Sequence, residues 1–133
     1  MKLEDQVVNL ELSIKLHDLG VKRRSYFVWH CYNSEGFDAD GSPLGKEVFD
    51  VTESWQIDEP LASAFTVAEL GEMLPSAIDS FYWIDMRNWY DFEICYQDDN
   101  YNIKHVVNDK SEANARAKML IWLIENGHVK VGE

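Results

Sequence analysis

The stretch Phe65-Thr-Val-Ala-Glu-Leu-Gly-Glu-Met-Leu-Pro75 predicts a short amphipathic helix. Thr66 is a residue type that caps helices, and Glu69 stands three positions later, where its carboxylate can reach back to the backbone N–H of Thr66. Leu70 is placed to contact the phenylalanine that precedes the cap, and the closing proline cannot continue the helix. Gly71 falls on the buried face, which predicts that another segment packs closely against it.

A second stretch, Ser111-Glu-Ala-Asn-Ala-Arg-Ala-Lys-Met-Leu-Ile-Trp-Leu-Ile-Glu-Asn-Gly127, predicts a longer helix. Ser111 is suited to cap its start, and Gly127 is the residue type that tolerates the left-handed conformation just past a helix end. Two apolar stripes leave only a narrow polar strip, so we expect this helix to be buried over most of its circumference. Glu112 precedes Arg116 by four residues, which is the favourable order for a helix ion pair.

The rest of the chain predicts one more helix and several strands. Asn9 is placed to cap a helix that ends at Leu19, although apolar residues at every second position also fit a strand. The stop signal at Gly20 favours the helix. Aromatic and β-branched runs predict strands at residues 26–32, 47–52 and 80–84, with an acidic, glycine-rich loop over 33–45 between the first two.

Residues 89–107 predict a β-hairpin whose turn is formed by the two aspartates at 98 and 99. In this register, alternate residues gather on one apolar face, and a slip by one residue would mix the two faces. The predicted cross-strand pairs include Tyr96 with Tyr101, Glu93 with Lys104 and Phe92 with His105.

Together these elements predict an α+β fold, with an antiparallel sheet of about four or five strands and about three helices packed on one face. The 133 residues have the length of one ordinary domain, so we expect residues 1–133 to form a single compact domain. Hydrophobic residues make up 46% of the chain, including five tryptophans, six tyrosines and six phenylalanines, and this content excludes disorder.

The chain is strongly acidic, with 24 aspartate and glutamate residues against 12 lysine and arginine residues and a net charge of −12. Direct binding to nucleic acid or to an anionic membrane is therefore disfavoured, because both need a basic surface. The basic cluster Lys22-Arg23-Arg24 follows a predicted helix end, and we interpret it as a partner of that helix dipole. Because neither a membrane span nor a signal-peptide core is found, we expect a cytoplasmic location, with Cys31 and Cys95 reduced and structural.

The signatures of most enzyme classes are absent from the sequence. Nucleotide-binding glycine loops, the esterase motif Gly-x-Ser-x-Gly and the zinc-protease motif His-Glu-x-x-His do not occur. Asp91 and Glu93 lie two apart on one predicted strand face, a separation that is compatible with paired-carboxylate hydrolysis, but Lys104 opposite Glu93 favours a salt-paired surface. His30 and His105 are predicted to be core histidines. We therefore assign no catalytic, cofactor-binding or metal-binding residue and expect no cofactor.

Residues 36–47 partly match the calcium loop of EF-hand proteins. Asp38, Asp40 and Glu47 stand at ligand positions, but Gly36 occupies the first position, which normally carries an acid. Strands rather than helices are predicted on both sides of the loop. The pattern favours a flexible acidic hairpin loop, with weak calcium binding by the three carboxylates left open.

The segments Ala64-Phe-Thr-Val-Ala-Glu-Leu-Gly-Glu-Met-Leu-Pro75 and Ala113-Asn-Ala-Arg-Ala-Lys-Met-Leu-Ile-Trp-Leu-Ile-Glu-Asn-Gly127, with residues 12–22 before them, resemble a group of short proteins encoded in bacterial genomes, prophages and bacteriophages. The three segments cover somewhat under a third of the chain. The aromatic strands and the acidic loop between them do not align to this pattern. The group has no assigned activity and no catalytic motif, so the resemblance implies a bacterial or bacteriophage setting in the cytosol and transfers no site residue.

Three functional hypotheses follow from these patterns. The first is a non-enzymatic domain that acts by protein contact, with an unknown protein partner and with self-association left open. The second is an acidic decoy that imitates nucleic acid and occupies a basic host protein. The third is a small hydrolase that uses carboxylates or a metal. Trp55 and Trp83 lie outside the best-supported strands, and the sequence does not assign them to a core or to an interface.

Overall fold

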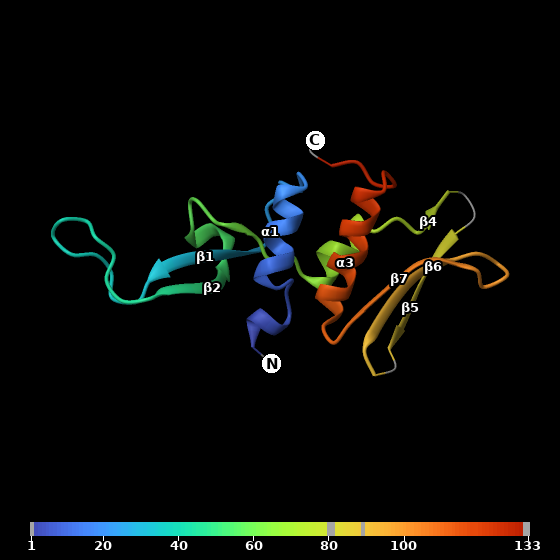
Figure 1. Ribbon diagram of the computed structural model, residues 1–133, viewed down its shortest axis with the longest axis horizontal. Helices are drawn as coiled ribbons and strands as arrows, with labels where there is room; N and C mark the ends of the chain where they lie inside the picture. Colours follow the sequence, from blue (N-terminus) through green and yellow to red (C-terminus); the bar gives the residue numbers. More distant parts are fainter. Residues whose placement is uncertain (1, 80–81, 89, 132–133) are drawn as a thin grey trace.

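Figure 1 shows the computed structural model, which describes residues 2–79, 82–88 and 90–131. The helices are α1 (Leu10–Asp18), α2 (Val67–Met73) and α3 (Glu112–Glu125), with two 3-10 turns, η1 (Leu3–Asp5) and η2 (Ser54–Gln56). The strands are β1 (Phe27–Asn33), β2 (Glu47–Glu53), β3 (Ala62–Ser63), β4 (Ala77–Ile78), β5 (Tyr82–Asn88), β6 (Phe92–Gln97) and β7 (Ile103–Asp109).

The predicted α+β class is confirmed. The strands form two antiparallel sheets, in the orders β2-β1-β3 and β4-β5-β6-β7, where the sequence predicted one. The helices lie between the two sheets instead of on one face of a single sheet (Figure 1). Of the helices in the described part of the chain, none combines the length and the apolar character that crossing a bilayer requires.

The three helices carry the caps that the sequence predicted. Asn9 caps α1 by accepting a hydrogen bond from the backbone N–H of Leu12 at 2.9 Å, and Ser111 caps α3 in the same way. The capping box of α2 is present: Thr66 Oγ1 accepts from Glu69 N at 3.2 Å, and Glu69 Oε1 accepts from Thr66 N at 3.0 Å. These bonds satisfy amide groups that the start of a helix leaves without partners.

Close packing of α2 on α3 explains the glycine in the middle of α2. A β-carbon at Gly71 would stand only 2.6 Å from Nη1 of Arg116. Arg116 also forms the predicted ion pair with Glu112, at 3.0 Å. The arginine side chain therefore crosses α2 at the one position that lacks a side chain.

The register of the β6–β7 hairpin differs from the prediction by four residues. Tyr96 faces His105 where Tyr101 was expected, and Glu93 faces Asn108 where Lys104 was expected. From Phe92 to Tyr96 the displacement is an even number of residues, so these side chains and their partners stay on their predicted faces. A register shift between Tyr96 and Gln97 then places Ile103 opposite Gln97, and Ile103, predicted on the apolar face, is 52% exposed. The predicted strand at 80–84 corresponds to the start of β5. Ser80 and Phe81 of that predicted strand, and Trp89 of the predicted hairpin, lie outside the described residues.

The loop between β6 and β7 explains this displacement. Asp98 Oδ1 accepts hydrogen bonds from the backbone N–H groups of Asn100 and Asn102, at 2.9 and 2.8 Å. Tyr101 adopts a left-handed conformation, with φ 64°, and β7 starts two residues later at Ile103. This aspartate-centred loop is longer than the two-residue turn that the sequence predicted.

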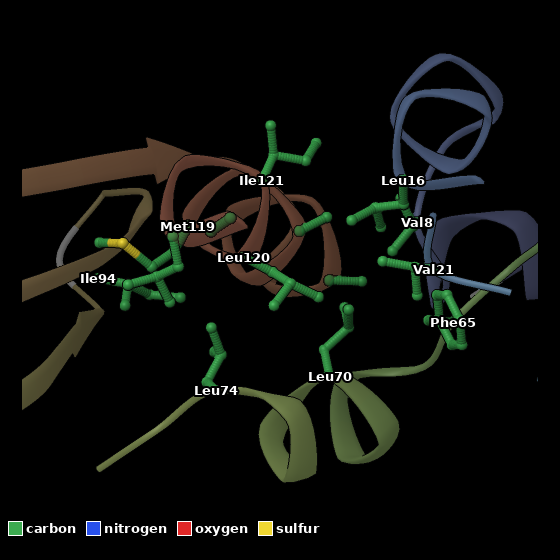
Figure 2. Close-up of a cluster of buried hydrophobic side chains, with 14 of the residues drawn as sticks. Val8, Leu16, Val21, Phe65, Leu70, Leu74, Ile94, Met119, Leu120 and Ile121 are labelled. Carbon is green, nitrogen blue, oxygen red and sulfur yellow. The ribbon is translucent and has the colours of Figure 1, made fainter. Parts of the chain in front are cut away.

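Two clusters of buried side chains hold the molecule together. The larger one is formed by the three helices and β6, and Figure 2 shows Met119 and Leu120 of α3 facing Ile94 of the sheet and Leu70 of α2. The smaller one consists of Val7, Trp29, Val51 and Ala64, with Leu3, Leu10 and Phe27 packed against them. The second cluster fixes only the near end of the β1–β2 pair.

Candidate interaction surface

A two-stranded unit extends away from the helices at one end of the molecule (Figure 1). This β1–β2 ribbon comprises residues 27–53, and its strands pair over seven residues, from Phe27 with Glu53 to Asn33 with Glu47. The third strand of the sheet, β3, pairs only with β1 residues 28 and 29. Among the described strands, the far half of the ribbon therefore has no neighbour on either side.

Backbone groups of β2 point toward the open edge of this sheet. Ser34 N donates to Lys46 O at 2.9 Å, and Ser54 N donates to Tyr26 O at 2.8 Å, so even-numbered residues of this strand bond to β1. Antiparallel pairing alternates along a strand, so odd-numbered residues such as Glu47 and Phe49 direct their N–H and C=O groups outward. The outer edge of β2 is a template for another strand.

The side chains of the ribbon change from buried to exposed along its length. At the near end Trp29 faces Val51, and both are buried in the smaller cluster. Two pairs further along, on the same face, Phe49 is 46% exposed opposite the exposed Cys31. Beyond the strands, Phe37 is 64% exposed. Exposed apolar side chains on the far half of the ribbon are Tyr32, Phe37, Leu44 and Phe49.

The ribbon is also acidic. Between residues 27 and 53 the chain carries six carboxylates and a single lysine, Lys46. The acidic residues are Glu35, Asp38, Asp40, Glu47, Asp50 and Glu53. The protruding ribbon therefore combines exposed apolar side chains with a strongly negative charge.

The tip of the ribbon is an ordered turn held by Asp38. Its Oδ1 atom accepts hydrogen bonds from the backbone N–H groups of Asp40 and Ser42, each at 2.9 Å. Glu47, the third carboxylate of the predicted calcium pattern, lies in β2. Across residues 2–79, 82–88 and 90–131, no group of three or more histidine, cysteine or acidic side chains is arranged to hold a metal ion.

The acidic pair singled out as a hydrolytic candidate lies on the other sheet. Asp91 and Glu93 line a shallow depression of about 240 Å³, together with Arg87 and Tyr90. The guanidinium of Arg87 stands 3.9 Å from Glu93, and it takes the place that Lys104 was predicted to fill. No histidine is among the residues that line this depression. The surface is therefore salt-paired as the sequence predicted, but the cation beside Glu93 is Arg87 instead of Lys104.

The predicted core histidines each stack on an aromatic ring. The His105 ring lies 4.2 Å from the ring of Trp122, and burial lowers the pKa of His105. His30 is half-buried and stacks on Tyr32 at 5.4 Å.

Both cysteines are free thiols, but their positions differ. Cys95 is buried in β6, and burial raises the pKa of its thiol. Cys31 is exposed on the ribbon, so the predicted structural role holds for Cys95 alone.

The basic cluster that follows α1 is occupied by contacts within the chain. Lys22 Nζ donates to the backbone carbonyl of His17 at 3.0 Å, as expected for a cation at a helix end. Arg23 pairs with Glu72 at 3.1 Å, and Arg24 donates to the backbone carbonyls at 54 and 57.

The two tryptophans that the sequence left unassigned are on the surface. Trp55 is 73% exposed and donates its ring N–H to Glu53 at 2.7 Å. Trp83 is 49% exposed and donates to Asp99 at 3.1 Å. Each indole therefore donates its ring N–H to a carboxylate at the surface instead of joining a core.

Sequence reasoning missed the exposure of Phe37 and Phe49. Both lie in segments that were correctly predicted as loop and strand, and the alternation of β2 placed Phe49 on the same face as the buried Val51. The acidic loop over residues 33–45 was a sequence signal for this exposure. A loop with so many carboxylates is unsuited to pack over Phe49 and bury it. Comparison of the chain with protein-family models, with curated proteins and with solved structures finds no match.

Proposed function

We propose that this protein is a non-enzymatic interaction domain and that the β1–β2 ribbon is its contact element. The observation that carries the proposal is the concentration of exposed apolar side chains on the far half of the ribbon, including Phe37 and Phe49. A two-stranded ribbon is only marginally stable in water, and covering its apolar side chains contributes roughly 25 cal/mol for each Å² removed from water. A partner that covers the ribbon therefore stabilises it.

The chemistry of the ribbon specifies the partner. A strand added beside β2 would run past Glu47, Phe49 and Glu53, whose backbone groups face the open edge. A second copy of this chain would bring the same carboxylates together, and like charges opposite one another are destabilising. We therefore infer a partner that offers an extended, positively charged segment with apolar side chains. The resemblance to bacterial and bacteriophage proteins favours a cytoplasmic bacterial partner.

The decoy hypothesis is a second candidate, because the carboxylates of the ribbon lie along a protruding edge. A decoy would bind the nucleic-acid groove of a basic protein, and this binding would weaken steeply as salt rises and would be competed by DNA. A partner held through Phe37 and Phe49 would resist salt. The hydrolase hypothesis makes a different prediction, turnover of a substrate that disappears in Asp91→Asn or Glu93→Gln.

Cys31 provides a direct test, because it is exposed on the ribbon while Cys95 is buried. A thiol-reactive benzophenone on Cys31 would be activated by light in bacterial lysate, and cross-linked proteins would be identified by mass spectrometry. We expect a cross-linked partner that is retained at high salt and is lost in Phe49→Ser. The matched control moves the label with Cys31→Ser and Tyr90→Cys, to a fully exposed position on the other sheet.

Equal cross-linking from position 90 would contradict the ribbon as the contact element. Cross-linking from Cys31 that survives Phe49→Ser but disappears when DNA is added would replace the proposal with the decoy.

A further inference from the structure

A cavity of about 540 Å³ opens where the end of α1, the end of α2, α3 and residues 129–131 converge. None of its lining residues belongs to the ribbon. Its volume falls within the range of about 300–1,000 Å³ that is typical of small-molecule sites. The inference drawn from it is independent of the function proposed for the ribbon.

The walls of this cavity are aliphatic. Val21 and Leu120 form its buried part, and both belong to the larger core cluster that Figure 2 shows. Met73 and Ile124 are partly buried and complete the apolar lining from α2 and α3. No aromatic ring lines the cavity, so the walls offer a surface for an alkyl chain and no stacking platform for a base or a planar ring.

Among the described residues, the charged groups that line the cavity are all basic. They are Lys22, Arg23 and Lys130, in a chain that carries twice as many acidic as basic residues. Arg23 is already paired with Glu72. The ammonium groups of Lys22 and Lys130 have no carboxylate within 4.0 Å in the part of the chain that the structure describes. Among the described residues, Lys130 has no carboxylate partner, and Lys22 is bonded only to His17, through its backbone carbonyl and ring nitrogen. Two cations without a carboxylate partner in this part of the chain therefore stand beside an aliphatic cavity.

We propose that this cavity binds a small amphipathic anion, an unbranched alkyl chain that ends in a single carboxylate. The alkyl chain would lie against Leu120 and Ile124, and the carboxylate would remain near the surface between Lys22 and Lys130. An anion of this kind gains apolar burial and keeps its charge partly hydrated, so it avoids the cost of burying a carboxylate. A cationic amphiphile of the same length would meet two like charges.

The test is a titration of the whole chain with decanoate, followed by the methyl NMR signals of Leu120 and Ile124. Decanol and decyltrimethylammonium serve as the neutral and cationic probes. We expect saturable shifts with decanoate and weaker binding of the cationic probe. The double variant Lys22→Gln and Lys130→Gln should weaken decanoate binding by roughly three- to tenfold and leave decanol unchanged, as expected for partly exposed ion pairs.

The control is Lys2→Gln with Lys46→Gln, which removes two lysines that do not line the cavity. This variant should bind decanoate as the native chain does. The proposal is overturned by any one of three results: the three probes bind equally, the cavity variant binds decanoate with unchanged affinity, or the shifts spread over the surface instead of centring on the cavity. Because all four substituted lysines are exposed, both double variants should fold.

Discussion

At the scale of single residues, Glu69 joins more parts of the fold than its place in a short helix indicates. Besides closing the capping box of α2, its carboxylate accepts hydrogen bonds from Ser25 Oγ at 2.7 Å and from Tyr26 N at 3.3 Å. Burial acts to raise the pKa of Glu69, but the hydrogen bonds from Thr66, Ser25 and Tyr26 outweigh it and hold the pKa below its usual value. The ionised side chain therefore ties α2 to the start of β1.

The lowered pKa of Glu69 makes its contribution to stability depend on pH. The contribution is complete above the unfolded-state pKa near 4.5 and is lost as the pH falls through the folded-state value. We expect Glu69→Gln to lower the unfolding free energy by about 1–2 kcal/mol near neutral pH, because each remaining bond to an uncharged amide is weaker. Urea unfolding near pH 7 and near pH 3 measures the difference, which should shrink at the lower pH.

The control for this prediction is Glu72→Gln on the same helix, since Glu72 is exposed and pairs only with Arg23 among its described contacts. It should change stability by less than about 0.5 kcal/mol. A loss in Glu69→Gln that is as large in acid as at neutral pH would show that the charge of the carboxylate is not responsible.

At the scale of elements, the sequence predicts what is decided locally and misses what is decided between strands. The helix caps at Asn9, Thr66 and Ser111 depend on residues three or four positions apart, and the structure confirms all three. The register of β6 with β7 depends on how many residues the loop contains. Asp98 fits both the predicted two-residue turn and the longer loop of the structure, in which it accepts hydrogen bonds from Asn100 and Asn102. The division of strands between two sheets depends on contacts between distant segments, which periodicity does not encode.

The β6–β7 loop offers a test at the same scale. Tyr101 holds a left-handed conformation, which costs a side-chain-bearing residue roughly 1–2 kcal/mol, and 76% of its surface is exposed. We expect Tyr101→Gly to raise the unfolding free energy by about 1 kcal/mol, because glycine adopts this conformation without strain. Asn100→Gly in the same loop is the control. It should not raise the unfolding free energy, because Asn100 does not have a positive φ. Thermal unfolding of the three proteins decides the outcome.

At the scale of the whole molecule, the candidate interaction surface shows the limit of sequence reasoning most clearly. Phe49 and Phe65 look alike in the sequence, as aromatic residues beside β-branched neighbours, yet Phe65 is buried in the main core and Phe49 is 46% exposed. The difference arises because the ribbon extends past the smaller cluster that covers its near end. Exposure of this kind follows from the arrangement of two sheets around the helices, which no short stretch of the chain specifies.

Because the fold contains two separate clusters of buried side chains, it matters whether the half around the smaller cluster and the half around the larger cluster unfold together. Three connections favour a single transition. In α1, Leu10 packs on the smaller cluster and Leu12, two residues later, packs on the larger one. Trp29 of the smaller cluster donates its ring N–H to the backbone carbonyl of Val8 at 2.9 Å, and the chain neighbours Ala64 and Phe65 belong to different clusters. These connections tie the smaller cluster to the larger one at several points along the chain. We therefore expect residues 1–133 to unfold cooperatively, as most single domains of this size do.

Fluorine NMR of the chain labelled with 5-fluorotryptophan tests this expectation, because Trp29 belongs to the smaller cluster and Trp122 packs against the larger one. Trp29→Phe and Trp122→Phe assign the two signals. Their native intensities should disappear at the same urea concentration, since the hydrogen bond from Trp29 to Val8 couples the clusters. If the Trp29 signal is lost at a lower urea concentration, the ribbon and its cluster form a separate, weaker unit, and a partner bound to the ribbon would then stabilise that half alone.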